Sequence, residues 1–426
     1  MKKYKLGDIA TVEISGVDKK IKDGEKEIRL CNFVDVYYNW AITTAQHDGF
    51  MLATARPNEI SKFQLKKGQV ALTKDSETRD DIGIPTYIAD DFDDAILGYH
   101  CALVTPNKDI LDGRYLNALL HTDYAKKYFA CNASGSGQRY ALSVEALNSF
   151  PVPMIPLRDQ ERIGEIFSAL DKKIELNRRI NQNLEAMAKQ LYDYWFVQFD
   201  FPNEEGKPYK SSGGEMVWNE KLKREIPKGW HASNVCSIAD ILSGGTPSKQ
   251  EPTFWNNGTI PFFGPTDYGG SIFQIETAEN ITAKGLSRCA SSLFDVGTII
   301  ITARGSIGKM VIVGTPMAMN QSCYALKSKN NEFEYLFFLT AQLIECLKAK
   351  GSGSTFKSII SSDIEQSTLC IAPQSFITQF GHVVKPIFEK IKGNSFEIAT
   401  LTKQRDELLP LLMNGQVSVN SDLSLG

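Results

Sequence analysis

Apolar positions recur most regularly within residues 157–198, where the chain shows a seven-residue repeat. The repeat consists of Ile163, Leu170, Asn177, Leu184 and Leu191. This spacing is typical of a long helix whose apolar stripe packs on another helix, with Asn177 as one polar side chain in the stripe. At ~1.5 Å per residue, about forty residues form a rod of roughly 60 Å. The pattern predicts a first long helix over residues 157–198.

A second set of apolar side chains completes the predicted stripe of this helix. Ile166, Ile180 and Met187 are expected to fill its intermediate positions, and Phe167 and Ile174 to widen it. A single rod cannot bury such a stripe alone. The helix must therefore pack either on its own domain or on another helix.

The same plan returns in residues 374–414. With a constant offset, Leu170, Asn177, Leu184 and Leu191 align with Ile387, Asn394, Leu401 and Leu408. Each copy follows a Gly/Ser-rich segment, at residues 135–140 and 351–356. Pro386 lies inside the second copy, so we expect the helix to start late or to kink near Lys385. The duplication indicates a two-headed binder, because each copy can engage its own half of a target.

Two packing arrangements are open for the repeated helices. Each could lie on its own domain, or the two could pair as a coiled coil. We favour the pair because both rods are too long for one small domain to cover. In that arrangement Asn177 and Asn394 are polar positions that fix the alignment of the helices.

Outside the long helices the chain alternates short β-type runs with turn residues. The runs are residues 28–34, 69–73 and 99–104 in the first half, and 260–263, 297–302 and 322–326 in the second. A helical segment follows in each half, at 114–129 and 335–348. The chain is expected to be α+β with a pseudo-two-fold repeat: a first domain (1–156), a first helix (157–198), a linker or crossing segment (199–230), a second domain (231–373), a second helix (374–414) and a flexible tail (415–426).

Composition narrows the class of protein. A chain of 426 residues should form two or more domains, and its 42% hydrophobic residues are enough for ordinary cores. No apolar run reaches membrane-spanning length, and no signal-peptide core follows the N-terminus. The eight cysteines form no Cys-x-x-Cys pair and are expected to be reduced thiols in the cytoplasm. The five histidines are scattered, so we expect no metal site.

The net charge of −3 is unusual for a protein that binds nucleic acid. Acidic and basic residues are nearly balanced within residues 1–150 and within 231–372, so neither region has the basic stripe of an independent phosphate clamp. Either the chain does not bind nucleic acid, or partners supply much of the cationic surface.

Familiar catalytic motifs are missing. Residues 304–309 hint at a phosphate loop, but Ala303 stands where a glycine is needed and no Ser or Thr follows Lys309. Arg304 likewise stands where a nucleophile elbow needs glycine. No Asn/Asp-Pro-Pro-aromatic segment is present to clamp a flipped adenine. A catalytic site assembled in space from scattered residues would leave no such trace and stays open.

What remains is loop chemistry suited to recognition, at matching places in both halves. Arginine can bond guanine bidentately and glutamine can do so with adenine. The alternative is that these are ordinary polar loops. The candidate DNA-binding residues of the first half are Lys74, Ser76, Arg79, Ser136, Gln138, Arg139 and Tyr140. Those of the second half are Gly245, Thr246, Thr266, Arg304, Ser306, Lys309, Gln321, Ser352, Ser354 and Lys357.

Several motifs together resemble the specificity (S) subunit of Type I restriction–modification enzymes over nearly the full length. They are Tyr-Trp-Phe-Val-Gln-Phe-Asp-Phe-Pro at 194–202, Gly-Lys-Pro-Tyr-Lys at 206–210, Lys-Gly-Trp at 228–230 and the segment 238–248 with its Ser-Gly-Gly-Thr-Pro-Ser end. Ala-Arg-Gly-Ser-Ile-Gly at 303–308, Asn-Gln at 320–321 and the segment 135–143 complete the set. The first half departs from the pattern, because it lacks the Gly-Gly-Thr-Pro and Ala-Arg-Gly-Ser-Ile-Gly motifs. The two domains should therefore read different sequences.

The resemblance implies two target-recognition domains joined by two antiparallel helices. Each domain would read one half of a bipartite, asymmetric site in double-stranded DNA, and helix length would set the unread spacer. Two methyltransferase (M) subunits would dock on the helices, carry S-adenosylmethionine and modify adenine. Two restriction (R) subunits would add ATP-driven translocation and cleavage. The chain itself would be non-catalytic, without membrane contact and without a cofactor of its own, since S-adenosylmethionine, ATP and Mg²⁺ would bind to the partners.

The resemblance also implies a subunit interface along the helices. Its expected residues are Ile163, Leu170, Asn177, Leu184, Leu191, Trp195, Phe196, Ile387, Asn394, Leu401 and Leu408. Three other hypotheses remain: a methylation-only system without R subunits, a stand-alone enzyme that acts on DNA, and a coiled-coil adaptor. Turnover by the purified chain would favour the enzyme. A complex that ignores DNA sequence would favour the adaptor.

Overall fold

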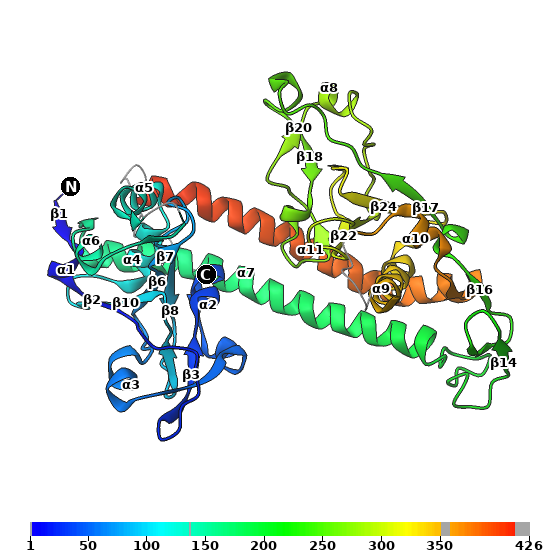
Figure 1. Cartoon of the computed structure of the whole chain (residues 1–426), viewed down its shortest axis with the longest axis horizontal. Coiled ribbons are helices and arrows are strands. Elements are labelled where there is room, and N and C mark those ends of the chain that lie inside the picture. The colour runs from blue at the N-terminus through cyan, green and yellow to red at the C-terminus, as the bar shows by residue number, and fades with distance from the viewer. Residues whose placement is uncertain (1, 136–137, 351–357, 414–426) are drawn as a thin grey trace. The chain divides into compact units, whose positions relative to one another are not determined.

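The computed structural model describes residues 2–135, 138–350 and 358–413, and the chain divides into two compact units. Unit 1 consists of Met1–Ile174 and Leu401–Gly426, and unit 2 consists of Glu175–Thr400. The two long helices, α7 (Leu157–Tyr192) and α11 (Gln374–Met413), each contribute residues to both units (Figure 1). The expected α+β class with two long helices is confirmed. The expected tail, 415–426, lies outside the described residues.

Unit 1 is built on a five-stranded sheet in the order β2-β10-β6-β8-β4. Its strands are β2 (Ala10–Ile14), β10 (Cys101–Pro106), β6 (Val70–Thr73), β8 (Pro85–Ile88) and β4 (Ala41–Ile42). All neighbours are antiparallel except β4 and β8, which are parallel. The smaller sheets contain β5 (Met51–Ala55), β3 (Lys26–Cys31) and β9 (Ala95–Leu97); β11 (Ser134–Gly135), β12 (Tyr140–Ala141) and β7 (Asp75–Ser76); and β1 (Lys3–Lys5) with β13 (Pro151–Pro153).

Unit 2 repeats this topology in a second five-stranded sheet, β17-β24-β21-β22-β19. Its strands are β17 (Ala239–Ser243), β24 (Cys323–Ser328), β21 (Ile299–Thr302), β22 (Met310–Val313) and β19 (Phe273–Gln274). The last pair is again parallel and the others antiparallel. The smaller sheets contain β20 (Asn280–Ile281), β18 (Ile260–Phe263) and β23 (Ala318–Met319); β14 (Met216–Asn219) and β15 (Arg224–Pro227); and β16 (His231–Ser233) with β25 (Leu369–Ile371). The internal repeat seen in the sequence is therefore a repeat of fold.

Short helices connect the strands in both units. Those of unit 1 are α1 (Leu6–Ile9), α2 (Phe33–Tyr38), η1 (Thr44–Gly49), α3 (Pro57–Phe63), α4 (Gly113–Leu120), α5 (Asp123–Asn132) and α6 (Val144–Asn148). Those of unit 2 are η2 (Asp193–Val197), η3 (Val235–Ser237), η4 (Pro252–Phe254), η5 (Pro265–Asp267), α8 (Ala283–Leu286), α9 (Phe333–Lys350) and α10 (Ser361–Gln366). No helix in the described parts of the chain is both long and apolar enough to cross a bilayer.

Two sequence-based element predictions were wrong in detail. Residues 28–34 are not one strand: β3 ends at Cys31, and α2 begins at Phe33 because the Asp35 carboxylate accepts the Asn32 N–H (2.7 Å) and caps the helix. Residues 114–129 are not one helix: α4 ends at Leu120, and the Thr122 hydroxyl accepts the Ala125 N–H (3.4 Å) at the start of α5. In both cases a local cap outweighed the average apolar pattern.

The apolar stripe of α7 runs along the side that Phe167 and Ile174 were expected to widen, and not along the side of Ile166, Ile180 and Met187. Ile174, Asn181 and Ala188 are buried, whereas Met187 is 53% exposed and Ile180 is only half-buried. The buried intermediate positions therefore lie four residues, and not three, after Leu170, Asn177 and Leu184 of the seven-residue repeat. On a helix a step of four residues falls about 40° to one side and a step of three about 60° to the other, so the choice depends on where the partner packs. The sequence alone does not give that position.

Pro386 does not delay the start of the second long helix, so this half of the sequence-based expectation is wrong, whereas a kink near Lys385 stays a prediction. Helix α11 begins at Gln374 and continues through Pro386 to Met413. Pro386 and His382 are both exposed, so water can reach the His382 carbonyl that loses its usual N–H partner. The proline is tolerated because it lies on the solvent face.

The expected linker, residues 199–230, is a folded part of unit 2. Phe199, Phe201 and Trp230 are buried in its main apolar cluster, and β14 and β15 form a hairpin. The Asp200 carboxylate accepts bonds from the Ser211 N–H (2.7 Å) and hydroxyl (2.7 Å). These contacts hold the segment in a fixed conformation, and Asp200 N donates to the Tyr194 carbonyl (2.9 Å) in η2, which follows α7. Its weak apolar periodicity reflects irregular backbone and not a free linker.

Within unit 2, the two long helices pair through buried asparagines. Asn394 Nδ2 donates to Asn181 Oδ1 (2.8 Å), and Asn177 Nδ2 donates to Glu397 Oε2 (2.8 Å). Asn181 follows Asn177 along α7, whereas its partner Asn394 precedes Glu397, the partner of Asn177, along α11. The two helices are therefore antiparallel. Both expected asparagines are buried, but they do not bond to each other. The partner of Asn394 is Asn181, which the sequence pattern did not single out.

Replacing Asn394 by alanine is expected to lower the free energy of unfolding by ~1–3 kcal/mol, because the buried Asn181 Oδ1 loses the Asn394 donor, while Asn181 Nδ2 keeps its longer bonds (3.4 Å) to Ile391 O and Ser395 Oγ. The double change Asn181→Leu, Asn394→Leu should cost less than the single change, since it removes both polar groups. Urea unfolding of each variant measures this. Asn183→Ala, exposed on α7, is the control. A single variant as stable as this control would contradict a structural role for the pair.

Candidate nucleic-acid interface

In each unit a buried threonine at the start of the central loop accepts hydrogen bonds from two backbone N–H groups at the end of the loop. We call this arrangement the threonine clip. In unit 1 the Thr73 carbonyl accepts the Gly83 N–H (3.0 Å) and its hydroxyl accepts the Ile84 N–H (3.0 Å). In unit 2 the Thr302 carbonyl accepts the Gly308 N–H (2.8 Å) and its hydroxyl accepts the Lys309 N–H (3.0 Å). The clip closes a longer loop in unit 1, residues 74–82, than in unit 2, residues 303–307.

The residue after each clip occupies the same backbone frame. Lys74 N donates to His100 O (2.9 Å), and Lys74 O accepts from Leu142 N (2.8 Å). In unit 2, Ala303 N donates to the Ser322 carbonyl (2.7 Å), and the Ala303 carbonyl accepts from Ile359 N (2.9 Å). Lys74 therefore corresponds to Ala303, and His100 to Ser322. The two units share these backbone hydrogen bonds and differ in the side chains at the bonded positions.

In unit 1 the small sheet β11-β12-β7 brings the two predicted loops together. Tyr140 pairs with Ser76 across β12 and β7, and the Arg79 guanidinium lies 5.0 Å from the centre of the Tyr140 ring. Gln138 and Arg139 are exposed in the turn between β11 and β12. Ser136 lies outside the described residues.

Asp75 is the electrostatic centre of this loop pair and was not predicted. Its carboxylate is 3.0 Å from Lys74 Nζ and 3.4 Å from Arg139 Nη2, and it also contacts His100 Nδ1. Burial alone would raise the pKa of Asp75, but the hydrogen bonds from His100 and Lys74 outweigh burial and lower the pKa below its ordinary value. Asp75 therefore stays ionised and holds three basic side chains around one buried point.

In unit 2 glycines permit close backbone approach beside the predicted residues. A Cβ on Gly245 would lie 2.7 Å from Ala290 N, so only glycine fits there. Gly245 N donates to Met319 O (3.1 Å), and the hydroxyl of the next residue, Thr246, bonds the amide oxygen of Gln321. Thr246 and Gln321 are both exposed. Two predicted residues far apart in the sequence thus meet at the surface.

The loop after the second clip presents two cations. Gly305 and Gly308 have φ of 78° and 77°, which glycine adopts without strain. Arg304 is exposed and forms no ion pair with any residue within the described ranges. Lys309 Nζ lies 5.2 Å from the ring centre of Tyr268. The backbone carbonyl of Ser306 accepts the Thr302 hydroxyl.

Three further predicted residues of this half, Ser352, Ser354 and Lys357, lie outside the described residues. Thr266 is exposed in η5 beside the same loop, where Pro265 approaches the position of a Cβ on Gly305 (4.0 Å). Both loop clusters consist of exposed donors and acceptors around a rigid sheet end. That arrangement suits hydrogen bonding to base edges and phosphates.

The residues expected at a subunit interface fall into two groups. The side chains of Ile163, Asn177, Trp195, Phe196 and Asn394 are buried by this chain itself. Phe196 packs between aromatic rings of unit 2 such as Tyr335, 4.8 Å between ring centroids. The half-exposed group is Leu170, Leu184, Leu191, Ile387, Leu401 and Leu408. For the buried group the side chains stabilise the units, which leaves the half-exposed group as the candidates for contact with a partner.

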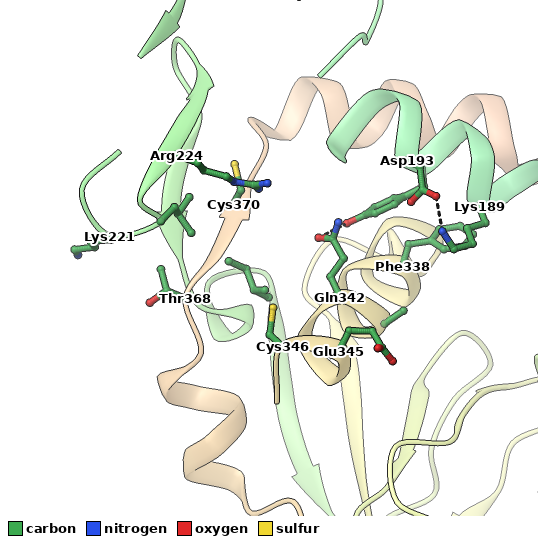
Figure 2. Close-up of a pocket in the computed structure, with 14 residues that line it drawn as sticks. Lys189, Asp193, Lys221, Arg224, Phe338, Gln342, Glu345, Cys346, Thr368 and Cys370 are labelled. Atoms are coloured by element: carbon green, nitrogen blue, oxygen red, sulfur yellow. Dashed lines mark hydrogen bonds and ion pairs between the residues drawn. The ribbon is translucent and has the colours of Figure 1, made fainter. Parts of the chain in front are cut away.

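A cavity of about 640 Å³ in unit 2 lies beside the end of α7 (Figure 2). Two of its charged lining residues form ion pairs: Lys189 bonds Asp193, and Glu345 lies 2.9 Å from Lys348 Nζ. Tyr192 donates to Gln342 (3.2 Å). Across the described ranges, no three His, Cys, Asp or Glu side chains are grouped so that they could hold a metal ion. All eight cysteines are free thiols, as expected.

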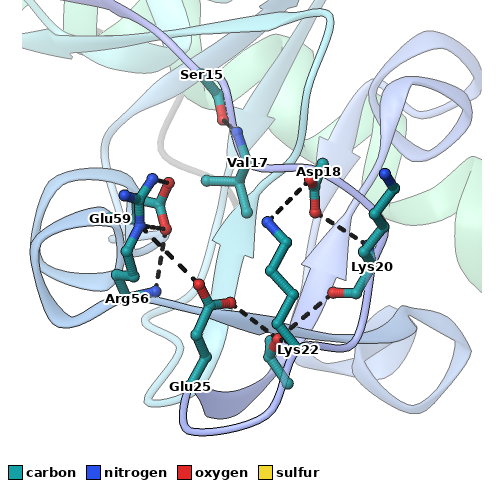
Figure 3. A network of polar contacts seen from close by, with 9 residues as sticks. Ser15, Val17, Asp18, Lys20, Lys22, Glu25, Arg56 and Glu59 are labelled. Atoms are coloured by element: carbon teal, nitrogen blue, oxygen red, sulfur yellow. Dashed lines mark hydrogen bonds and ion pairs between the residues drawn. The ribbon is translucent and has the colours of Figure 1, made fainter.

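The loop after β2 and the start of α3 in unit 1 each form an internal ion pair (Figure 3). Lys22 Nζ lies 3.0 Å from the Asp18 carboxylate, and Arg56 Nη2 lies 2.8 Å from Glu59. The Thr54 hydroxyl donates to Glu25 (3.0 Å). These cations are engaged, which makes this face a weaker candidate for phosphate binding than the loops at the clips.

Comparison with known proteins gives concordant results. The family model described as Type I restriction modification DNA specificity domain matches residues 1–186 and 227–406. The chain is similar to the Type I restriction enzyme HindI specificity subunit of Haemophilus influenzae, at 26% identity over 84% of this chain and 88% of that protein. It is also similar to the MjaIX specificity subunit of Methanocaldococcus jannaschii, at 30% identity over 73% and 71% of the two chains.

The fold is similar to a solved structure, the S subunit of a Type I restriction–modification system from M. genitalium. The TM-score is 0.55 at 16% sequence identity, and the match covers 96% of this chain and 95% of that one. At this identity the likeness concerns the fold.

Proposed function

Because the chain belongs to the family of Type I restriction modification DNA specificity domains, we propose that it is the DNA sequence-specificity subunit of a Type I restriction–modification complex. Each unit reads one half of a bipartite, asymmetric site. The chain selects the DNA sequence, and partner subunits carry out the chemistry.

One observation carries this proposal: the same backbone frame presents different side chains in the two units. After the clip, unit 1 places Lys74 and the buried Asp75, whereas unit 2 places Ala303 and the exposed Arg304. A frame repeated only for stability would not need to differ in the residues that follow the clip. Two readers of different half-sites would differ at those positions, because base identity is recognised by the donors and acceptors that meet each base edge.

The chemistry of unit 2 suits the major groove. The exposed Arg304 guanidinium, which has no ion-pair partner in the described parts of the chain, offers two parallel N–H donors to guanine O6 and N7, and the exposed Gln321 amide can bond adenine N6 and N7. Lys309 provides a point charge for a phosphate. In unit 1, Arg79, Arg139 and Tyr140 take these roles.

The proposal assigns catalysis to partners. Two M subunits would bind S-adenosylmethionine and methylate adenine, and two R subunits would use ATP and Mg²⁺. The half-exposed group on the long helices would form the contact surface. The near-balanced charge of the chain supports this division, since a net charge of −3 leaves the partners to supply much of the cationic surface around DNA.

A direct test uses the chain alone and with its M partner. The chain alone should transfer no methyl group. The complex should methylate one bipartite motif, which sequencing of methylated bases in host DNA identifies. Methylation by the chain alone, or methylation by the complex without sequence preference, would overturn the proposal.

Arg304→Ala is expected to weaken binding of the complex to its own site by ~1–3 kcal/mol and to relax the preference at one position of the second half-site, if Arg304 bonds a base. A phosphate contact would instead weaken all sequences alike and reduce the salt dependence. Competition between duplexes that differ at single positions distinguishes these cases. Arg178→Ala, an exposed arginine on α7, is the matched control. Equal binding by Arg304→Ala and control would refute a DNA contact.

A further inference from the structure

Two residues of unit 1, Tyr99 and His100, stand where unit 2 has Gln321 and Ser322. The correspondence rests on backbone bonds at both sides of the pair. Gly98 N donates to the Cys31 carbonyl (2.8 Å), as Asn320 N donates to the Phe263 carbonyl (2.9 Å). The carbonyls of His100 and Ser322 then accept the N–H that follows each clip (2.9 and 2.7 Å).

The strand register gives the same correspondence independently. Cys101 pairs with Thr73 in unit 1, and Cys323 pairs with Thr302 in unit 2. Counting back two residues from each cysteine again places Tyr99 at the position of Gln321. The match therefore does not depend on one hydrogen bond or on sequence similarity, which is absent at this pair.

The surroundings of Tyr99 make it available at the surface. Its side chain belongs to a residue that is 43% exposed, and its ring lies 3.6 Å from the His100 ring, centroid to centroid. His100 has a φ of 72°, a left-handed conformation that is uncommon for residues other than glycine. Its contacts with Asp75 and with the Arg139 guanidinium (Nε2 to Nη2, 3.0 Å) hold it in this conformation. An unfavourable backbone conformation held by a charged cluster is typical of functional sites.

The neighbouring charges explain why an aromatic side chain matters here. At the place of Arg304, unit 1 has Asp75, whose carboxylate is buried and engaged by three basic groups. It offers no free hydrogen-bonding edge to a ligand. Tyr99 and Arg139 are among the exposed groups beside this carboxylate.

We propose that Tyr99 is a specificity-determining residue of unit 1, which contacts a base edge from the frame position that Gln321 occupies in unit 2. The inference rests on the proposed function. The tyrosine hydroxyl can bond a base edge in the major groove, and the ring can contact the 5-methyl group of thymine. His100 and Asp75 are positioning residues that hold the ring and the Arg139 guanidinium.

The test compares purified complexes of the chain and its M partner by selection from randomised duplexes. Tyr99→Gln gives unit 1 the side chain of unit 2 at this position. The expected result is a change of preference by roughly 5- to 100-fold at one position of the first half-site, with the second half-site unchanged. Tyr99→Phe divides the two contacts: loss of preference indicates the hydroxyl, and retained preference indicates the ring.

Tyr124→Gln, a tyrosine on α5 outside the cluster, is the control and should select the parent sequence. If Tyr99→Gln also selects the parent sequence with the parent preference at every position, the inference is overturned. The variants Gln321→Tyr and Arg304→Ala distinguish a failure of the Tyr99 inference from a failure of the proposed function. Should they alter the second half-site while Tyr99→Gln alters nothing, the proposed function stands without Tyr99. Should no variant of either unit alter selection, the proposed function itself fails.

Discussion

A complex whose chain carries four extra residues in each long helix is expected to methylate a site with a spacer about one or two base pairs longer. Four helical residues add ~6 Å, and B-DNA rises roughly 3.4 Å per base pair. The sequences of both half-sites should stay the same, because no residue of the loop clusters changes. Sequencing of methylated bases measures the spacer directly.

The division of the chain decides where these residues should be inserted. An insertion near Asn183, which the sequence alone would suggest, falls inside unit 2 and shifts Ala188 and Tyr192 out of its core. Insertion after Ile174 in α7 and after Thr400 in α11 leaves the internal contacts of each unit intact. It also keeps Asn181 opposite Asn394. The same insertion in the exposed turn at Glu205 is the control and should leave the spacer unchanged. An active variant with the parent spacer would exclude helix length as the ruler.

Exchanging the first domain for that of another specificity subunit is expected to replace one half-site completely and to leave the other unchanged. Because helix α7 begins at Leu157, the junction is designed after residue 156. A junction at 150 would separate β13 from β1, whose pairing joins Pro153 to Lys3. Residues of the long helices that pack on unit 1, including Ile163, Phe167 and Leu409, stay with the recipient, so the donor domain needs apolar residues facing them.

Methylated-base sequencing of cells that carry the exchanged chain and the M partner reads both half-sites at once. The control chain is built through the same junction but carries residues 1–156 of the parent, so that its amino-acid sequence is unchanged. Altered bases in both half-sites would show that the domains do not read independently.

Periodicity predicted the long helices because it is a property of neighbouring residues. Ile163, Leu170 and Asn177 mark one face whatever the partner is. Ile174 was part of the predicted stripe, but the burial of Asn181 depends on where α11 packs, and an antiparallel register across two distant segments leaves no local trace. Thr122 and Asn32 show the same limit at smaller scale, because a single capping bond ended an element that the apolar pattern continued.

The candidate site was predictable where a loop repeated a recognisable motif and not elsewhere. Arg304 and Gln321 stood in such segments, and the structure places both at the surface of one loop cluster. Tyr99 and His100 began an apolar run that predicts only a strand. Their correspondence with Gln321 and Ser322 becomes visible only through the hydrogen bonds beside the clip, since the side chains share no chemistry. Their DNA-binding role stays a prediction, as does that of the other loop residues.

The threonine clip has a consequence for how such a protein can change. In each clip two backbone N–H groups donate to one buried threonine. The clip therefore does not depend on particular side chains of the loop or on the length of the loop that it closes. Residues 74–82 and 303–307 already show two lengths on one frame. Changes at the exposed positions of the loop therefore leave the clip intact, whereas β7 and the buried Ile82 tie part of the longer loop to the fold of unit 1. New specificities can be tried without loss of the folded state, and the barrier between one recognised sequence and the next is low.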